Sequence, residues 1–399
     1  MSGKLAISGG VPVRKEFLPY GHQWIDANDI KAVTEVLKTD WITQGPIVNE
    51  FEQIISHYCH ATFAVAFSSG TAALHAAAFA AGITTGSEII TTPITFVADG
   101  NCALYQGGSV KLADIQPTTY NIDPQKIKNT ITSKTKAIIP VDFAGQPCDI
   151  DEINEIAHEQ KIPVIEDAAH ALGAEYKGKK VGALVDMTIL SFHPVKAITT
   201  GEGGMVLTNN QEYYERLQTF RTHGITKNEK KLQKNEGAWY YEMQDLGYNY
   251  RLTDFQCGLG ISQYKKLDQF IHRRREIAHQ YNDAFKELPE IVTPYEKKDV
   301  RSAYHIYVIQ LQLEKLRADR KTIFDALRAE NIGVQVHYIP VHYHPYYQQN
   351  VGYKKGDFPN AERYYERAIT LPLFPKMTNQ DIEDVIQAVN KIITFYRTK

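Results

Sequence analysis

The chain has 399 residues, of which 43% are hydrophobic and 23% are charged, and its formal net charge is −2. This length allows about two domains with large buried cores, and the balanced charge gives no reason to expect nucleic acid or an anionic membrane as a partner. The four cysteines show no CxxC spacing, and no signal peptide or membrane-length apolar segment is visible. We therefore expect a soluble cytoplasmic protein.

The first part of the chain changes from irregular to regular. Residues 1–27 form a predicted N-terminal segment, Asn28 is a candidate helix cap, and a further helix is expected around 48–59. From residue 62, apolar strand-like runs alternate with helix-length segments, which predicts a mostly parallel sheet covered by helices on both faces. The expected strands are 63–67, 88–91, 110–114, 137–141, 163–166, 187–192 and 205–208, and the expected helices are 71–81, 95–106, 123–131, 149–160 and 210–221.

The pattern changes again near residue 266. A long, charged helix over 266–288 is expected to connect the large domain, 28–265, to a smaller α+β domain, 266–399. Within the smaller domain the expected strands are 304–311 and 334–336, and the expected helices are 320–330, 360–370 and 378–396.

Ligands of parallel sheets bind beyond the carboxyl ends of the strands, so the residues that follow each predicted strand are the candidates for a site. Ser69-Gly70-Thr71 opens a helix, which makes it either an ordinary cap or an anion-binding site. Phe96 is either a core side chain or a stacking platform. Asp167 ends an apolar strand, where it needs a cationic partner or caps the next helix.

Lys196 lies between two buried strand-like runs, 187–192 and 205–208. Burial depresses the pKa of a lysine, and a neutral amine is a nucleophile toward aldehydes. A lone lysine of this kind is usually a surface residue. Together, however, the anion site, the aromatic ring, the acid, Ser191 and Lys196 match the phosphate, ring, pyridine nitrogen and aldehyde of pyridoxal 5′-phosphate (PLP).

The motifs that carry these residues resemble those of the DegT/StrS nucleotide-sugar aminotransferases, from about residue 17 to the C-terminus. They are SGTAAL (69–74), TPITF (92–96), EDAAH (166–170), SFHPVK (191–196), GEGG (201–204), LGYNYRLTD (246–254) and HYIPVH (337–342). The resemblance implies a PLP-dependent transferase of fold type I, the fold of aspartate aminotransferase. Residues 90–98 and 142–149 are most similar to the branch that makes UDP-4-amino-4,6-dideoxy-N-acetyl-β-L-altrosamine for pseudaminic acid.

The resemblance also implies residue roles. Lys196 would bond covalently to the cofactor, Asp167 would pair with its pyridine nitrogen, and Asn249 would reach the phosphate in a partner subunit, which implies a homodimer with shared sites. His170 departs from the glutamine that is common in the wider family. The remaining cofactor contacts would be Gly70, Thr71, Ala72, Phe96, His170 and Ser191, and the substrate contacts would be Tyr20, Trp41, Ile42, Thr43, Gln44, Arg251, His337, Tyr338, Ile339 and Pro340.

The implied reaction moves the amino group of L-glutamate, through pyridoxamine 5′-phosphate, to the C4 ketone of UDP-2-acetamido-2,6-dideoxy-β-L-arabino-hex-4-ulose. An aminotransferase for another nucleotide 3- or 4-keto sugar is one alternative, and a non-enzymatic regulator on the same fold is another. Lys196 argues against a sugar 3-dehydratase, which carries histidine at that place. Gly258-Leu259-Gly260 lacks the third glycine of a dinucleotide-binding fingerprint. Pro340 and Pro345 break any helical i, i+4 spacing among His337, His342 and His344, so we expect no metal site there.

Overall fold

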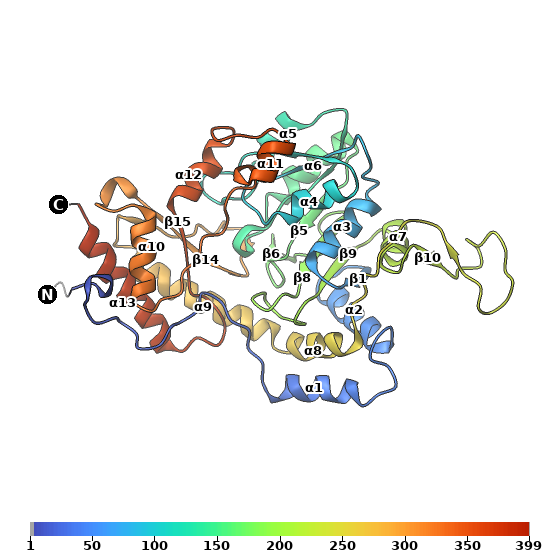
Figure 1. Ribbon diagram of the computed structural model, residues 1–399, viewed down its shortest axis with the longest axis horizontal. Helices are drawn as coiled ribbons and strands as arrows, with labels where there is room; N and C mark the ends of the chain where they lie inside the picture. The colour runs from blue at the N-terminus through green and yellow to red at the C-terminus, as the bar shows by residue number, and fades with distance from the viewer. Residues whose placement is uncertain (1–3, 399) are drawn as a thin grey trace.

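A seven-stranded sheet forms the centre of the larger part of the computed structural model, which describes residues 4–398 (Figure 1). Strands pair in the orders β3-β2-β4 and β5-β8-β9-β1, and isolated parallel bridges between Ile138 and Val164 and between Val141 and Asp167 join the two groups. The strands are β1 (Phe63–Phe67), β2 (Glu88–Thr91), β3 (Ser109–Leu112), β4 (Thr135–Ile138), β5 (Ile165–Asp167), β8 (Met187–Ser191) and β9 (Gly204–Thr208).

The predicted mostly parallel sheet is confirmed, and β9 is the exception. It pairs antiparallel with both β8 and β1. No helix lies between β8 and β9, so the chain turns back and runs directly alongside β8. Parallel neighbours would need a crossover connection instead. The loop between these two strands, 192–203, contains Lys196.

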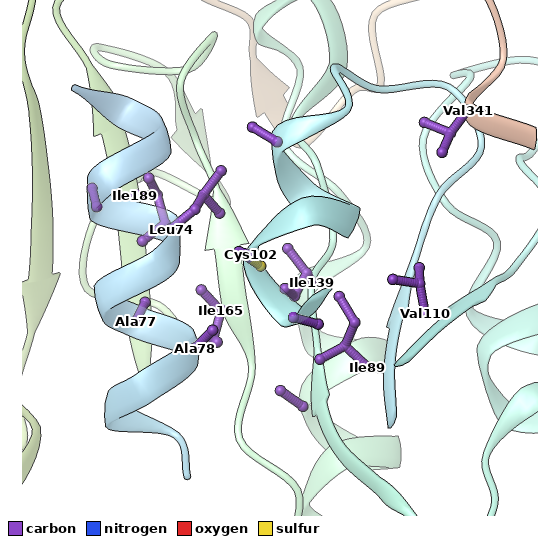
Figure 2. Close-up of a cluster of buried hydrophobic side chains, with 14 of the residues drawn as sticks. Leu74, Ala77, Ala78, Ile89, Cys102, Val110, Ile139, Ile165, Ile189 and Val341 are labelled. Carbon is purple, nitrogen blue, oxygen red and sulfur yellow. The ribbon is translucent and has the colours of Figure 1, made fainter. Parts of the chain in front are cut away.

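Helices cover both faces of the sheet because alternate strand residues point to opposite sides. On one face, Leu74 and Ala78 of α3 (Gly70–Ala80) and Cys102 of α4 (Ala98–Tyr105) pack with Ile189 and Ile139 in one buried cluster (Figure 2). The opposite face is covered by α2 (Pro46–Tyr58), α5 (Pro124–Thr130), α6 (Ile150–Gln160) and α8 (Asp254–Tyr264). The apolar runs of the sequence reflect this burial on two sides.

Helix α1 (Ala27–Leu37) begins one residue before the predicted cap. Asp26, not Asn28, is the N-cap, and its carboxylate accepts from the amides of Asn28 and Asp29. Asp29 bonds back to the Asp26 amide, which completes a reciprocal capping box. Asn28 was the wrong choice because Asp26 has both the acceptor and the acidic residue three positions later.

The C-terminal elements surround a separate antiparallel sheet, β12-β14-β15, with strands Ile291–Val292, Tyr307–Leu311 and Ala368–Leu371. Two predictions were wrong here. Residues 334–336 form only an isolated bridge from Gln335 to Thr370, and the predicted helix 360–370 ends as α12 (Pro359–Arg367) before β15 begins. Ile369 and Thr370 are β-branched, and pairing with β14 buries them. The other helices are α9 (Leu267–Phe285), α10 (Arg320–Ala329), α11 (Pro345–Asn350) and α13 (Asn379–Tyr396).

The N-terminal segment packs against these C-terminal elements. Leu5 and Leu18 belong to the same buried cluster as α9, α10 and α13, and Glu330 accepts from the amides of Ala6 and Val13. The proposed boundaries at 27/28 and 265/266 stay predictions, and residues 1–3 of the first segment lie outside the described residues.

Two small pairs of strands lie outside both sheets. After α7 (Gln211–Arg221), the segment that holds β10 (Ile225–Thr226) and β11 (Glu242–Met243) extends away from the body (Figure 1). The other pair, β6 (Glu175–Tyr176) and β7 (Lys179–Lys180), is joined by β13 (Val300–Arg301).

Candidate active site

A cavity of about 460 Å³ opens at the carboxyl ends of β1, β2, β5 and β8. This is the edge of the sheet where the sequence predicted a site, because the ends of parallel strands meet there. The predicted residues that line the cavity are Tyr20, Gly70, Thr71, Phe96, Asp167, His170, Ser191, Lys196, His337 and Tyr338.

The N-terminus of α3 forms one wall of this cavity. Ser69 is the N-cap, and its hydroxyl accepts from the Ala72 amide at 3.1 Å, so the amides of Gly70 and Thr71 stay available to an anion. Gly70 lies close against Ser191, since a Cβ added at Gly70 would come within 3.2 Å of the Ser191 Cβ. Gly204 lets β9 lie close to Ser69, because a Cβ at Gly204 would be 2.5 Å from the Ser69 carbonyl oxygen.

Lys196 projects from the loop between β8 and β9 into the cavity. Burial lowers the pKa of its amine to about 8, against the opposing attraction of the nearby carboxylate of Asp167. Its backbone is fixed by two hydrogen bonds, from its own amide to the His193 carbonyl at 2.9 Å and from Arg274 to its carbonyl at 3.4 Å. The lysine therefore combines a fixed backbone with an amine that is partly neutral near physiological pH.

Asp167 is the last residue of β5, and only 8% of its surface is exposed. The Ala169 amide donates to its Oδ1 at 2.8 Å, and its backbone bonds to Pro140 and Asp142, in the segment that follows β4. Burial raises the pKa of this carboxyl, while the Ala169 amide and Lys196 oppose the rise. The side chain is thus rigid, and it lines the cavity together with Lys196.

His170 is held in one orientation by two contacts. The Ala144 amide donates to Nδ1 at 3.3 Å, which places the ring proton on Nε2, 3.1 Å from the Tyr338 hydroxyl. Burial lowers the pKa of His170 well below its usual value, so the ring is neutral. His305 lies beside it with 4.2 Å between the ring centroids.

Several predicted residues do not line the cavity of the single chain. Ala72 is buried in α3, and Pro340 is also buried. Asn249 is exposed, and its backbone forms a bridge to Thr222. The remaining members of this group are at least partly exposed; they are Trp41, Ile42, Thr43, Gln44, Arg251 and Ile339.

The cavity wall also contains residues that the sequence did not indicate. His305 comes from the turn before β14, in the C-terminal region, where nothing in the local pattern distinguishes it from a core histidine. Thr95 and Glu202 lie within motifs that were recognised, and their position beside Phe96 and Gly203 was the available signal.

Two of the three neighbouring histidines contact different partners. His337 contacts the Thr370 hydroxyl at 2.8 Å, and His342 contacts Glu362 at 3.0 Å. Within residues 4–398, no group of three or more His, Cys, Asp and Glu side chains is arranged to hold a metal ion. Nor does any helix in that range have the length and apolar character needed to cross a membrane.

A family model described as the DegT/DnrJ/EryC1/StrS aminotransferase family matches residues 23–390. The chain belongs to this family. It is 43% identical to the spore coat polysaccharide biosynthesis protein SpsC of Bacillus subtilis, over 96% of this chain and 99% of that protein. It is 39% identical to the UDP-4-amino-4,6-dideoxy-N-acetyl-β-L-altrosamine transaminase of Campylobacter jejuni, over 94% and 97% of the two chains.

Solved structures of family members have the same fold. Helicobacter pylori PseC, described as an aminotransferase of pseudoaminic acid biosynthesis, superposes with a TM-score of 0.88 at 32% identity, covering 96% of this chain and 100% of that one. Spr1654 of Streptococcus pneumoniae, a putative sugar aminotransferase solved in its PLP form, gives a TM-score of 0.88 at 29% identity and the same coverage. The fold type I prediction is confirmed.

The enzyme is an aminotransferase, and PLP is the cofactor of its family. The cavity fits that group. It offers the free amides at the start of α3 for a phosphate, a buried carboxyl for a ring nitrogen and an amine of lowered pKa for an aldehyde. The Phe96 ring, which is 58% exposed, also lines the cavity.

Proposed function

We propose that the enzyme transfers the amino group of L-glutamate to the C4 ketone of a UDP-linked 4-keto-6-deoxy-N-acetylhexosamine, UDP-2-acetamido-2,6-dideoxy-β-L-arabino-hex-4-ulose. The product would be a UDP-4-amino-4,6-dideoxy sugar for pseudaminic acid-type glycans. The observation that carries this proposal is the placement of Lys196 and Asp167 in one cavity of a chain so similar to the Campylobacter jejuni transaminase. The four buried free cysteines suit a reaction in the cytoplasm.

Bound PLP supplies an aldehyde that accepts the amine and a ring that accepts electrons. Around it, Lys196 would form the covalent bond, Asp167 would keep the ring nitrogen protonated, and His170 would lie beside the ring edge. Phe96 would pack on the ring face. The phosphate would be held by Gly70, Thr71, Ala72 and Ser191, with Asn249 supplied by a partner subunit.

The proton transfers would be the work of Lys196. With a pKa of about 8, a substantial fraction of its amine is neutral near physiological pH and able to remove the proton on the α-carbon of glutamate. The same amine, once protonated, would return a proton to C4 of the sugar. Because 2-oxoglutarate leaves before the sugar binds, the kinetics should be ping-pong.

The sugar nucleotide would bind where the cavity opens between the two halves of the chain. In support, Tyr20, His337 and Tyr338 line the cavity. The exposed residues Trp41, Ile42, Thr43, Gln44, Arg251 and Ile339, with Pro340, would complete the site in a homodimer.

The test is the visible absorption of the PLP-loaded enzyme. Glutamate should abolish the cofactor's visible band, and the UDP-4-keto sugar should restore it with formation of the 4-amino sugar. The Lys196→Ala variant should catalyse neither half. A band that no amino donor changes, or a wild-type rate in Lys196→Ala, would refute the proposal.

The second candidate is an aminotransferase for a different nucleotide keto sugar, such as one linked to dTDP or GDP. The observation that favours it is the higher identity, 43%, to SpsC of Bacillus subtilis, a spore coat polysaccharide protein. The same assay discriminates the two, because glutamate would still discharge the band while only the dTDP- or GDP-linked ketone would restore it.

A further inference from the structure

Asp99 lies in the first turn of α4, directly behind the wall of the cavity, and it is fully buried. One carboxyl oxygen, Oδ2, accepts a hydrogen bond from the Thr95 hydroxyl. The other, Oδ1, is buried without any donor among the described residues. A buried carboxylate oxygen with no partner is costly, so the environment of Asp99 favours a protonated carboxyl.

The carboxyl group of Asp99 lies beside that of Asp167, close enough for one to donate a hydrogen bond to the other. Two carboxyl groups in such contact cannot both be ionised at a reasonable cost, so they share one proton. Burial and the charge of Asp167 raise the pKa of Asp99 well above its usual range. For Asp167 the rise due to burial is opposed by the Ala169 amide, by Lys196 and by the hydrogen bond from Asp99. Asp167 Oδ1 accepts from the Ala169 amide, whereas Asp99 Oδ1 has no donor among the described residues, so the proton belongs to Asp99.

We propose that Asp99 is a positioning residue whose carboxylic acid donates a hydrogen bond to Asp167 and so keeps that carboxylate ionised and oriented at the cavity wall. Asp99 does not line the cavity itself, so it acts only through Asp167. The inference rests on the proposed role of Asp167 toward the ring nitrogen of PLP.

Other titratable groups also face this pair. Cys102 comes from the same helix, Tyr347 from α11, and Tyr338 and Lys196 from the cavity wall. Burial raises the pKa values of Cys102, Tyr338 and Tyr347, so these three are neutral at physiological pH. Lys196 is the cation that interacts with this pair, and its strongest interaction is with Asp167.

The first experiment uses the cofactor-free protein and needs no catalysis. At neutral pH, the infrared carbonyl band of a protonated carboxylic acid should be smaller in Asp99→Asn than in the wild type by one group. Asn retains an acceptor for Thr95 and an N–H donor for Asp167, so the variant should fold. An unchanged band would overturn the inference without touching the assignment of Asp167.

The second experiment measures the pH profile of the PLP dissociation constant. Without a donor from position 99, the pKa of Asp167 rises, so Asp99→Leu should lose PLP affinity at a higher pH than the wild type as the solution is acidified. At neutral pH, its binding should be weaker by about tenfold, as expected for one lost hydrogen bond to a charged group. Asp99→Asn should restore the wild-type profile. A profile unchanged in Asp99→Leu would overturn the inference.

Asp142 provides a matched control. It forms a second buried carboxyl pair, with Glu166, and both have a buried oxygen that lacks a donor. Asp142→Asn should also remove one protonated-carboxyl band but should leave the PLP profile unchanged. If Asp167→Ala binds PLP as the wild type does, the proposed role of Asp167 fails, while the infrared result still decides the state of Asp99. Should Asp99→Leu not fold, the infrared band of Asp99→Asn decides the inference.

Discussion

Arg274 of α9 donates to the carbonyl oxygens of Val195 at 3.3 Å and Lys196 at 3.4 Å. The same guanidinium donates to the carbonyls of His305 and Leu373 at 2.9 and 3.1 Å. Its side chain is among the largest that are fully buried, and the burial lowers its pKa to about 10. One arginine thus joins the loop that contains Lys196, between β8 and β9, to two segments of the C-terminal region.

We expect Arg274→Met to lower the free energy of unfolding by about 3 kcal/mol or more, because several buried carbonyl groups lose their donor. Arg273→Met is the matched control on the same helix. Arg273 is partly exposed and bonds to Met377 and Asn379, so its loss should cost only about 1 kcal/mol. Denaturant unfolding of both variants checks this, and equal losses would contradict the special role of Arg274.

The pKa of Lys196 gives a second prediction. Only the neutral amine attacks the aldehyde of PLP, so covalent attachment of PLP to the cofactor-free enzyme should accelerate with rising pH, with a midpoint near 8. Asp167 raises the pKa of this lysine, and Asp167→Asn should therefore move the midpoint to lower pH. Borohydride trapping followed by mass spectrometry measures the rate. A midpoint at the ordinary pKa of lysine would contradict the burial of the amine.

The sequence was sufficient to predict the residues that follow the parallel strands. Thr71, Asp167 and Lys196 are far apart in the chain, yet the rule for the carboxyl ends of parallel strands places them at one cavity. Apolar runs of strand length, with helices between them, carry that information because burial on both faces removes polar residues from the strands.

The residues that escaped prediction depend on long-range packing. His305 reaches the cavity from the C-terminal region, and no local period indicates that. Asp99 occupies the first turn of a helix, where an acidic residue is ordinarily explained by the helix dipole. Its position beside Asp167 could therefore not be inferred from the sequence. Strand β15 (Ala368–Leu371) pairs with β14, and this pairing overrides the helical pattern of the preceding residues.

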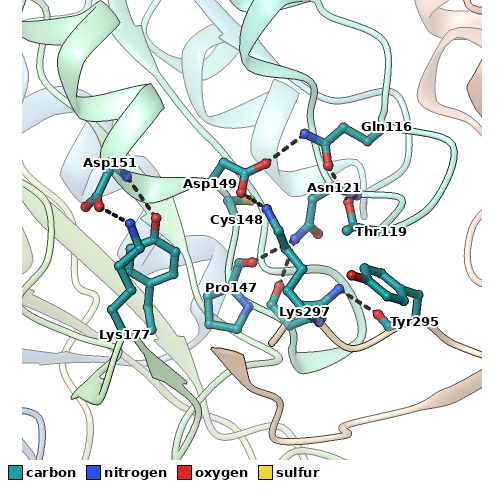
Figure 3. Close-up of polar contacts among 12 residues, drawn as sticks. Gln116, Thr119, Asn121, Pro147, Cys148, Asp149, Asp151, Lys177, Tyr295 and Lys297 are labelled. Atoms are coloured by element: carbon teal, nitrogen blue, oxygen red, sulfur yellow. Dashed lines mark hydrogen bonds and ion pairs between the residues drawn. The ribbon is translucent and has the colours of Figure 1, made fainter. Parts of the chain in front are cut away.

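A cluster of polar contacts around Asp149 allows a third prediction (Figure 3). Asp149 accepts from Gln116 at 2.7 Å and forms an ion pair with Lys297, which ties the start of α6 to the segment before β13. Because its side chain is only 14% exposed, Asp149→Ala should lower the free energy of unfolding by about 1–3 kcal/mol.

Asp151 is the control for this cluster, since its ion pair with Lys177 is half exposed on both sides. An exposed ion pair contributes about 0–1 kcal/mol, so Asp151→Ala should change stability little. High salt should reduce even that difference, whereas the Asp149 effect should persist because buried pairs are screened less. Equal effects of the two substitutions would contradict the distinction by burial.

The fourth prediction tests the proposed homodimer with shared sites. Asn249 is exposed in the single chain, outside the cavity that contains Lys196. If Asn249 completes the phosphate site of its partner, a dimer of one Lys196→Ala chain and one Asn249→Ala chain has one site with both defects and one site with neither. Each variant alone has a defect in every site.

Mixing the two variants under conditions that exchange subunits should therefore restore activity. With random exchange at equal amounts, half of the dimers are mixed and each has one intact site, so about a quarter of the wild-type activity should return. Lys196→Ala mixed with Asp167→Ala is the control, because both residues lie in the same cavity of one chain. In those mixed dimers every site retains one defect, so no activity should return. A monomer in solution, or equal recovery in both mixtures, would refute the shared site.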